Sequence, residues 1–157
     1  MRSIDLHLHS FYSDGSDSPT DVVRKAKSNE LGLISLTDHD SIDGYFEALE
    51  ECNKVGISIM PGVEITTITH HMLGYNFDIN DREFRDFIRY SRSLQEDVGK
   101  KRTEKLREYG VPITIDKVKD RYPNSALSKM TLLKVMKYDL ECIEYLKDQH
   151  GSSSREE

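Results

Sequence analysis

The segment IDLHLHSFYSDGS, residues 4–16, decides the fold of the first half of this chain. In an extended strand, successive side chains point to opposite faces, so His7 and His9 share one face while Leu6 and Leu8 occupy the other. Two imidazoles at the end of a strand can bind one metal ion. The alternative is a pair of half-exposed histidines that alternate with leucines. The segment therefore predicts a strand that ends in a candidate metal site.

The segments that follow alternate between helix and strand patterns. We predict helices over residues 17–32 and 41–56, the first with Asp17 or Ser18 as N-cap and Gly32 as its end. Short apolar runs predict further strands at 33–36, 57–60, 63–67 and 71–75. Nearly continuous apolar strands that alternate with helices are typical of a parallel sheet. The first half of the chain is therefore predicted to be an α/β fold.

The pattern changes after Asn80. The segment DREFRDFIRYSRSLQEDVGKKRTEKLREYG, residues 81–110, has apolar residues at helical spacing and predicts one long helix. Shorter helices are predicted at 116–121, 127–137 and 140–149. The expected organisation is a β/α metal-binding half over 1–80, a helical region over 81–150 and a flexible tail over 151–157.

Composition and charge narrow the class of protein. Charged residues make up 32% and apolar residues 36%, no apolar run has the length of a membrane span, and the first residues lack the apolar stretch of a signal peptide. Cys52 and Cys142 lie in no CxxC pattern, so we expect a soluble protein in the reducing cytoplasm. Residues 1–80 carry a net charge of −8 and residues 81–150 a net +3. The acidic half predicts a cation site, and the basic half either faces an anionic substrate or is a solvated helical surface.

Metal-type side chains follow each predicted strand. In parallel α/β folds, reactive side chains gather beyond the carboxyl ends of the strands. The candidates in chain order are His7, His9, Asp14, Asp38, His39, Asp40, Glu64, His70 and His71. Imidazole and carboxylate ligands without thiolate suit Zn²⁺, Mn²⁺ or Fe²⁺, and two such ions can promote phosphoester hydrolysis. No phosphate-binding glycine loop competes with this interpretation, because the lone Gly-Lys of DVGKK lacks the flanking glycine and the strand.

Four motifs together carry a resemblance to a known family. They are H-x-H-x4-D at His7–Asp14, T-D-H-D at Thr37–Asp40, P-G-V-E-I at Pro61–Ile65 and H-x-L-G-Y at His71–Tyr75. In order, residue type and spacing they resemble the PHP family, named for polymerase and histidinol phosphatase. The chain looks most like the stand-alone branch with a helical insert, whose members hydrolyse phosphate esters of nucleotides or trim nucleic-acid 5′ ends.

The resemblance implies a distorted (β/α) barrel around two or three divalent ions, Mn²⁺, Zn²⁺ or Fe²⁺. Position by position, it implies that His7, His9 and Glu64 hold the first ion, that Glu64 and His71 hold the second, and that Asp14 and His39 hold the third. Asp38 and Asp40 would be catalytic-site groups that orient His39. His70 could replace His71 after a slip of one residue, although the following M-L-G-Y favours His71.

Two further family motifs, A-H-P and D-x-H, do not occur in this sequence, and His150 is the only histidine after His71. We therefore expect a partial (β/α) barrel of PHP type with an all-helical second half. Its open edge would be covered by the helices of 81–150 or by a second copy in a homodimer, unless the chain is a piece of a longer protein.

The expected function is a metal-dependent phosphoesterase with an incomplete site and low activity toward a phosphorylated small molecule or nucleotide. The alternative is a non-catalytic, metal-stabilised binding or oligomerisation module. A third hypothesis, nucleic-acid binding, depends on the basic face of Arg82, Arg85, Arg89 and Arg92.

Overall fold

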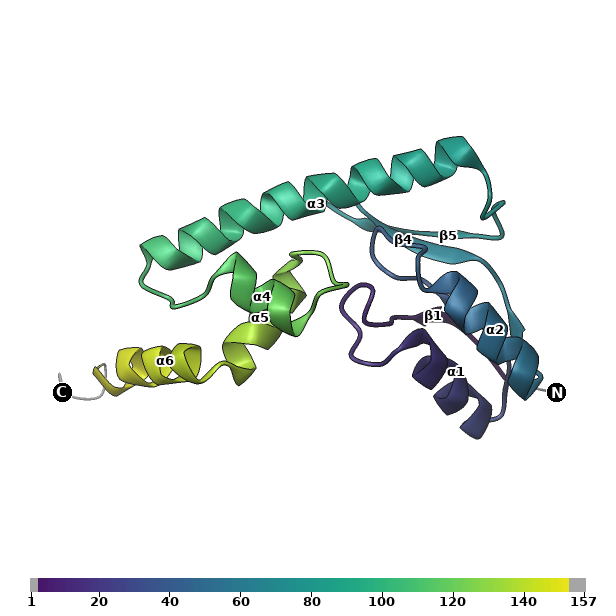
Figure 1. Ribbon diagram of the computed structural model, residues 1–157, viewed down its shortest axis with the longest axis horizontal. Coiled ribbons are helices and arrows are strands. Elements are labelled where there is room, and N and C mark those ends of the chain that lie inside the picture. The colour runs from purple at the N-terminus through teal and green to yellow at the C-terminus, as the bar shows by residue number, and fades with distance from the viewer. Residues whose placement is uncertain (1–2, 153–157) are drawn as a thin grey trace. The chain divides into compact units, whose positions relative to one another are not determined.

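The structure of the protein is a computed structural model that describes residues 3–152. The chain forms two compact units, Met1–Gln95 and Glu96–Glu157, called unit 1 and unit 2 below, and the division falls within the long helix α3 (Arg82–Glu108). Unit 1 contains helices α1 and α2 and every strand found among the described residues (Figure 1). The sequence predicted that the β/α part ends near residue 80, and this stays a prediction. The structure divides the chain after Gln95, so the first turns of α3 belong to unit 1.

Unit 1 begins with a parallel sheet. Strands β1 (Ser3–Leu8), β2 (Leu31–Leu36) and β3 (Ser58–Ile59) lie in the order β1-β2-β3. Helices α1 (Pro19–Ser28) and α2 (Tyr45–Val55) make the two crossovers. The parallel pairing predicted from the alternating strand and helix patterns is confirmed for these three strands.

The ends of α1 follow from local side-chain chemistry. Ser18 is the N-cap, and its Oγ accepts a hydrogen bond from the backbone N–H of Asp21 at 3.0 Å. The prediction that Gly32 ends this helix is wrong, because Asn29 already caps it and Glu30 turns the chain with a positive φ of 59°. Gly32 instead lies in β2, which starts two residues earlier than the apolar run suggested.

Helices α1 and α2 lie side by side and share one apolar core with the sheet (Figure 1). The buried members of this core are Val22, Val23, Ala26, Ile34, Leu36, Ala48, Cys52 and Ile57. Leu8 of β1 packs against the same core. Because side chains alternate along a strand, His7 projects from the opposite face of β1, away from these helices.

The last two strands form a hairpin beside the sheet. β4 (Gly62–Thr66) and β5 (His71–Tyr75) are antiparallel, with Thr66 opposite His71. The two strands pair antiparallel because only four residues separate β4 from β5, whereas a parallel crossover needs about a dozen. The hairpin adjoins the segment after β2, because the N–H of Asp40 donates to the carbonyl of Glu64 at 2.9 Å. The result is a partial (β/α) barrel.

The first turns of α3 cover the hairpin within unit 1. Ile88 of α3 is buried with Ile42, Val63 and Ile79, and Phe84 packs against this cluster. Several other apolar residues of α3, among them Phe87, Tyr90 and Leu94, remain substantially exposed. Although α3 is long, neither it nor any other helix in residues 3–152 is apolar enough to cross a membrane.

Unit 2 is helical. It consists of the second half of α3 with α4 (Ile115–Arg121), α5 (Lys129–Tyr138) and α6 (Leu140–Ser152), which confirms the predicted helices of this region. Its buried core consists of Val111, Ile113, Val118, Leu127, Leu132, Val135 and Cys142. Of the predicted tail over 151–157, only Gly151 and Ser152, with which α6 ends, lie within the described residues.

Candidate metal centre

The loop after β1 is held by one buried carboxylate. The backbone N–H of Ser10 donates to Asp38 Oδ1 at 2.7 Å, and the hydroxyls of Ser10 and Ser13 donate to Asp38 at 2.6 Å each. These three donors offset the cost of burying the carboxylate charge of Asp38. Asp38 therefore fixes the path of the chain between His9 and Asp14.

Gly15 lets this loop fold back on itself. A Cβ at position 15 would lie 2.5 Å from the carbonyl oxygen of His9, which is closer than van der Waals contact allows. The N–H of Gly15 also donates to the carbonyl of Ser10 at 2.9 Å. The absence of a side chain at this position is what allows Asp14 to reach His9.

Glu64 of β4 stands at the centre of the site. His7 Nε2 lies 2.9 Å from Glu64 Oε2, and His9 Nε2 lies 3.1 Å from the same oxygen. On the other side, His71 Nδ1 lies 2.8 Å from Glu64 Oε1. His39 Nε2 is more distant, 3.7 Å from Oε2. Four imidazoles from three segments of the chain, His7 and His9 at the end of β1, His39 after β2 and His71 in β5, therefore surround one buried carboxylate.

A second carboxylate extends the cluster. Asp14 Oδ1 lies 3.2 Å from His9 Nδ1, and Asp14 Oδ2 lies 3.8 Å from His39 Nε2. The donor atoms form three overlapping triads, within each of which all atoms lie within 4.8 Å of one another. The triads are His7-His9-Glu64, His9-Asp14-His39 and His39-Glu64-His71.

The surroundings of the His9 imidazole favour a positive charge at this position, either a second proton on the ring or a bound cation. Both of its ring nitrogens face carboxylates, Glu64 on one side and Asp14 on the other. A neutral imidazole has one N–H, so the second approach needs either another proton or a cation. Burial by itself lowers the pKa of His9, but the hydrogen bond to Asp14 and the charges of Asp14, Asp38 and Glu64 outweigh it and raise the pKa.

The pKa values of the neighbouring groups shift in directions that suit ligands. Burial lowers the pKa of His39 more than Glu64 and Asp14 raise it, so the ring favours the neutral form that binds metal. Burial by itself raises the pKa of Glu64, but the hydrogen bond from His7, the charge of His39 and the other imidazoles outweigh it, so the carboxylate is favoured. The neutral imidazole of His39 beside the ionised carboxylate of Glu64 fits a divalent cation.

The hairpin decides between the two adjacent histidines. Because β5 runs antiparallel to β4, its first residue lies beside the last residue of β4, which brings His71 to Glu64. His70 is exposed, and its Nδ1 lies 2.7 Å from Thr69 Oγ1 instead. In this structure His71, and not His70, contacts the centre.

Comparison with known proteins places this arrangement in a family. The family profile described as PHP domain matches residues 5–141, which is most of the chain. The chain belongs to the PHP domain family. The four motifs seen in the sequence, and the resemblance based on them, are therefore confirmed at the level of the family.

Relatives with named activities match parts of the chain. A protein of Haemophilus influenzae named 5'-3' exoribonuclease is 34% identical over 122 residues, covering 75% of this chain and 44% of that protein. A 3',5'-nucleoside bisphosphate phosphatase of Chromobacterium violaceum is 39% identical over 82 residues, covering 50% of this chain and 29% of that protein. The chain thus spans less than half the length of either PHP relative.

Solved structures share the fold. One from Bifidobacterium adolescentis, described as a candidate metal-dependent phosphoesterase, aligns with a TM-score of 0.77 and 24% identity over 92% of this chain and 54% of that chain. Another, from Chromobacterium violaceum, is described as an amidohydrolase with bound sulfate and no metal. It aligns with a TM-score of 0.76 and 27% identity over 85% of this chain and 49% of that chain. The partial barrel with a helical second half is thus a PHP-type fold.

Asp38 and Asp40, which the PHP resemblance had assigned to orient His39, contact other groups. Asp38 fixes the β1 loop, as described above. Asp40 Oδ1 accepts hydrogen bonds from the backbone N–H of Thr66 at 3.1 Å and from the hydroxyl of Ser91 in α3 at 2.5 Å. Its Oδ2 is buried without a hydrogen-bond partner among the described residues. Asp40 thus ties the segment that carries His39 to β4 and to α3.

Sequence reasoning missed the hydroxyl groups of the PHP site. Ser10, Ser13 and Ser91 donate to the two buried aspartates, and Thr66 Oγ1 lies 3.4 Å from His39 Nδ1. For Asp38, the sequence offered one signal, the pair of hydroxyl residues Ser10 and Ser13 directly after the H-x-H motif. Ser91 lies 51 residues from Asp40 and gave no local signal at all.

Proposed function

We propose that this chain carries the metal centre of a PHP-type phosphoesterase that acts on a phosphate ester of a nucleotide or on a nucleic-acid 5′ end. The observation that carries the proposal is the Glu64 carboxylate, surrounded by the imidazoles of His7, His9, His39 and His71. The names of the relatives, an exoribonuclease and a nucleoside bisphosphate phosphatase, support a phosphate ester as substrate. The sulfate in one related structure supports the same chemistry, because sulfate has the shape of phosphate.

The triads suggest how divalent ions would be held. His7, His9 and Glu64 would hold one ion, and Glu64 would be shared with a second ion at His71. Asp14 and His39 would take part in holding a third. The ligand set suits Mn²⁺, Zn²⁺ or Fe²⁺, and which of them is bound stays a prediction.

The ions and the residues around them would make different contributions to hydrolysis of a phosphate ester. Bound divalent ions would supply Lewis acidity that lowers the pKa of water and offsets the charge of the phosphate. Asp38 holds the loop that positions His9 and Asp14, so these ligands need little rearrangement. The side chains of His7 and His71 are 50% and 51% exposed, so a phosphate can approach from that side.

We further propose that this ligand set is incomplete and that turnover is low. The sequence contains neither the A-H-P nor the D-x-H motif that the family resemblance associates with further ligands. Fewer ligands hold ions less tightly and position water less well. Homodimer formation and a cytoplasmic location stay predictions.

The first experiment is a calorimetric titration of the purified chain with Mn²⁺ and with Zn²⁺. We expect saturable binding with fewer ions than the full family cluster, because only part of the motif set is present. The His9→Ala, Glu64→Ala double variant should bind neither ion. A flat titration of the parent chain with both ions would overturn the proposal.

A second candidate is the non-catalytic binding or oligomerisation module. It is favoured by exposed apolar residues on α3 within unit 1, Phe87 at 47%, Tyr90 at 62% and Leu94 at 47%. A phosphatase assay with an aryl phosphate and a nucleoside 3′,5′-bisphosphate in Mn²⁺ separates the two candidates. Higher turnover by the parent than by the double variant supports the enzyme, and equal turnover supports the module.

A further inference from the structure

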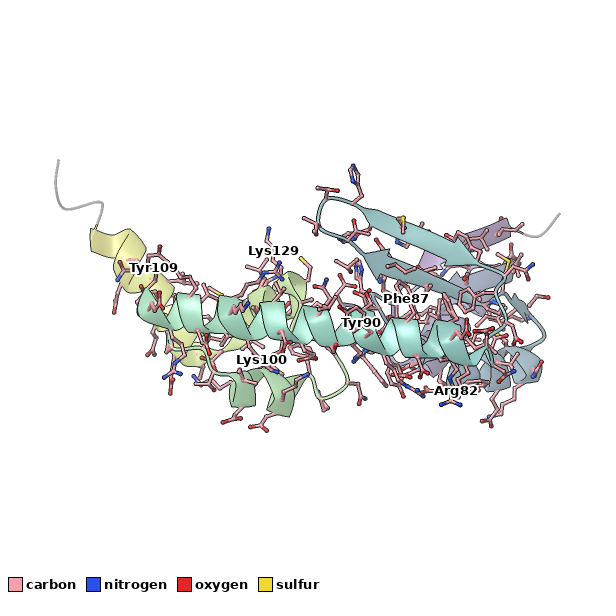
Figure 2. The ribbon with its side chains drawn as sticks, turned by 90° about the horizontal axis from the view of Figure 1, so that it is seen from above. Arg82, Phe87, Tyr90, Lys100, Tyr109 and Lys129 are labelled. Atoms are coloured by element: carbon pink, nitrogen blue, oxygen red, sulfur yellow. The ribbon has the colours of Figure 1, made fainter. Side chains whose placement is uncertain are left out.

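The basic residues of unit 1 are concentrated on one face of α3. Four of the nine Lys and Arg residues in 1–95 are Arg82, Arg85, Arg89 and Arg92, while residues 1–80 are strongly acidic. At 3.6 residues per turn these four positions fall within about 80° of the helix circumference. Figure 2 shows Arg82 near the first turn of this helix. We call these four residues the arginine face.

The arginine face is distinct from the other two faces of α3 in unit 1. Ile88 and Ser91 are buried on one side of the helix. Phe87 and Tyr90, labelled in Figure 2, project from another and are exposed. The guanidinium groups therefore project from a surface that neither the apolar core nor the apolar residues of the helix occupy.

The arginine face borders an open hollow. Asn80, Arg82, Arg85, Asp86 and Arg89 line a space of about 320 Å³. Asp86 lies within it, 2.7 Å from Arg89 and 3.8 Å from Arg82, and so neutralises part of the positive charge. Three guanidiniums against one carboxylate leave a net positive charge at the hollow. The side chain of Arg82 is 94% exposed and that of Arg89 68% exposed, so both can turn toward a ligand.

The far end of the arginine face touches the loop of the metal centre. The guanidinium of Arg92 donates to the carbonyl oxygen of Tyr12 at 3.3 Å. Tyr12 lies in the loop that Asp38 holds, between the candidate ligands His9 and Asp14. A ligand that follows the arginine face from Arg82 to Arg92 is therefore led toward the candidate metal centre.

We infer that the arginine face binds the phosphodiester backbone of a single-stranded polynucleotide whose end is presented to the metal centre. Ten residues of helix extend about 15 Å, which exceeds one phosphate group and matches a short run of backbone. Guanidinium groups bind phosphate oxygens in a bidentate manner, and a row of them reads no base sequence. The inference deepens the proposed function, because it favours a polynucleotide over a mononucleotide as substrate.

The test measures RNA binding without metal. The probe is a 5′-phosphorylated, 3′-fluorescein single-stranded oligoribonucleotide of about ten nucleotides, in the size range that one small domain covers. Fluorescence anisotropy is recorded in EDTA at several salt concentrations, for the parent and for the Arg82→Gln, Arg85→Gln, Arg89→Gln triple variant. The matched control is Lys25→Gln, Lys27→Gln, Lys54→Gln, which removes the same charge from α1 and α2. Circular dichroism checks that each variant is folded.

We expect the triple variant to bind the RNA at least about tenfold more weakly at low salt, and the slope of log K against log salt to fall by about 2. The lysine control should bind like the parent. The Arg→Lys triple variant keeps the charge and should retain most of the binding. If the triple glutamine variant does not fold, Arg82→Gln and Arg89→Gln, at two exposed positions, replace it, and each should weaken binding. Inorganic phosphate at the same total phosphate concentration should compete poorly, because a single phosphate cannot occupy the whole face.

Three results would overturn the inference. They are equal binding by the parent and a folded glutamine variant, equal loss in the lysine control, and full competition by inorganic phosphate. Because the assay contains no metal, it is independent of the calorimetric test of the metal centre. A flat metal titration with RNA binding intact would reject the proposed phosphoesterase and leave the arginine face standing as a binding surface.

Discussion

Units 1 and 2 bury polar groups in very different ways. All four buried carboxylates among the described residues, Asp38, Asp40, Glu51 and Glu64, lie in unit 1. The buried polar side chains of unit 2 are neutral hydroxyls, Thr103, Ser125 and Thr131. Its core otherwise consists of aliphatic and sulfur side chains. Unit 2 is therefore an ordinary apolar core, whereas unit 1 accepts buried charge.

The difference is informative because buried charge is costly unless it is paired. In unit 1, Glu51 is paired with Arg24, and Asp38 accepts three hydrogen bonds. Glu64 has only imidazoles around it, and Asp40 keeps one oxygen without a partner. A carboxylate that only imidazoles compensate and a carboxylate oxygen that lacks a partner mark the part of the chain where packing alone does not explain the residues.

The largest expected contrast between the units comes from metal binding. With Mn²⁺ or Zn²⁺ at about 100 times its dissociation constant, unit 1 should gain about 2.7 kcal/mol of stability, because only its folded form presents the ligands. Hydrogen exchange should slow in residues 3–95 and stay unchanged in residues 96–152. Glu64→Gln should abolish the effect, since it removes the shared charge while keeping the shape.

Glu50→Gln is the matched control, because Glu50 is an exposed carboxylate that pairs with Lys54 on α2. It should leave the metal-dependent protection intact. Equal metal-dependent protection in both units would show that they unfold together, and protection retained by Glu64→Gln would remove Glu64 from the site.

The next effect concerns the apolar core of unit 2. Leu127→Ala should lower the free energy of unfolding of this unit by about 3 kcal/mol, because Leu127 is fully buried. A Cβ added to Gly99 of α3 would overlap the carbonyl oxygen of Leu127, so α3 and the backbone at Leu127 are already in close contact. We therefore expect little collapse of the backbone around the cavity that Leu127→Ala leaves. Denaturant-dependent hydrogen exchange would locate the loss.

Leu140→Ala serves as the control for the same substitution at an exposed position and should change stability little. If Leu127→Ala weakened protection in residues 3–95 as strongly as in 96–152, the apolar core would not belong to unit 2 alone.

A smaller effect is expected at Ser91. Ser91→Ala removes the hydroxyl that donates to Asp40, and it should cost about 1 kcal/mol of stability in unit 1. Metal affinity, measured by calorimetry, should fall by up to about tenfold, because Asp40 holds the segment that carries His39. Ser91→Thr should restore both values.

Ser93→Ala is the control in this case, since Ser93 donates only to the backbone carbonyl of Tyr90 on the exposed side of α3. Loss of stability without any change in metal affinity would limit Ser91 to a packing role.

The smallest difference between the units is expected in the alkylation rates of their buried cysteines, which should be similar. Burial raises the pKa of Cys52 in unit 1 and of Cys142 in unit 2 to about 11. At pH 8 the reactive thiolate is therefore about 100-fold scarcer than for a thiol with a pKa of 9, and alkylation should be slow at both sites and accelerate as the pH rises toward 11. Mass spectrometry after iodoacetamide treatment measures both rates. Fast alkylation of one cysteine in the folded protein would show that its unit opens.

Local patterns predicted most of the secondary structure, because the signals act over a few residues. Ser18 caps α1, and Gly56 ends α2 in the left-handed conformation, as their positions in the sequence indicated. The end of α1 was misplaced because Asn29 stopped the helix before Gly32 could. Helical spacing identified the apolar residues of α3 but not which of them are buried, because spacing does not show what covers a face of a helix.

The candidate ligands could be identified from the sequence alone because motif spacing and strand alternation placed them at the ends of strands. The contacts between these ligands could not be predicted from the sequence. His7 and Glu64 are 57 residues apart, and the periodicity of a strand or helix says nothing about contacts over such a separation. The M-L-G-Y that follows His71 had already favoured it over His70, and the antiparallel pairing of β5 explains how His71 reaches Glu64. The partners of Asp38 and Asp40 required the folded loops. The amino-acid sequence determined which side chains are available to bind metal, since this depends on chemistry and spacing. Only the tertiary structure decided which of them converge on Glu64, since convergence depends on long-range packing.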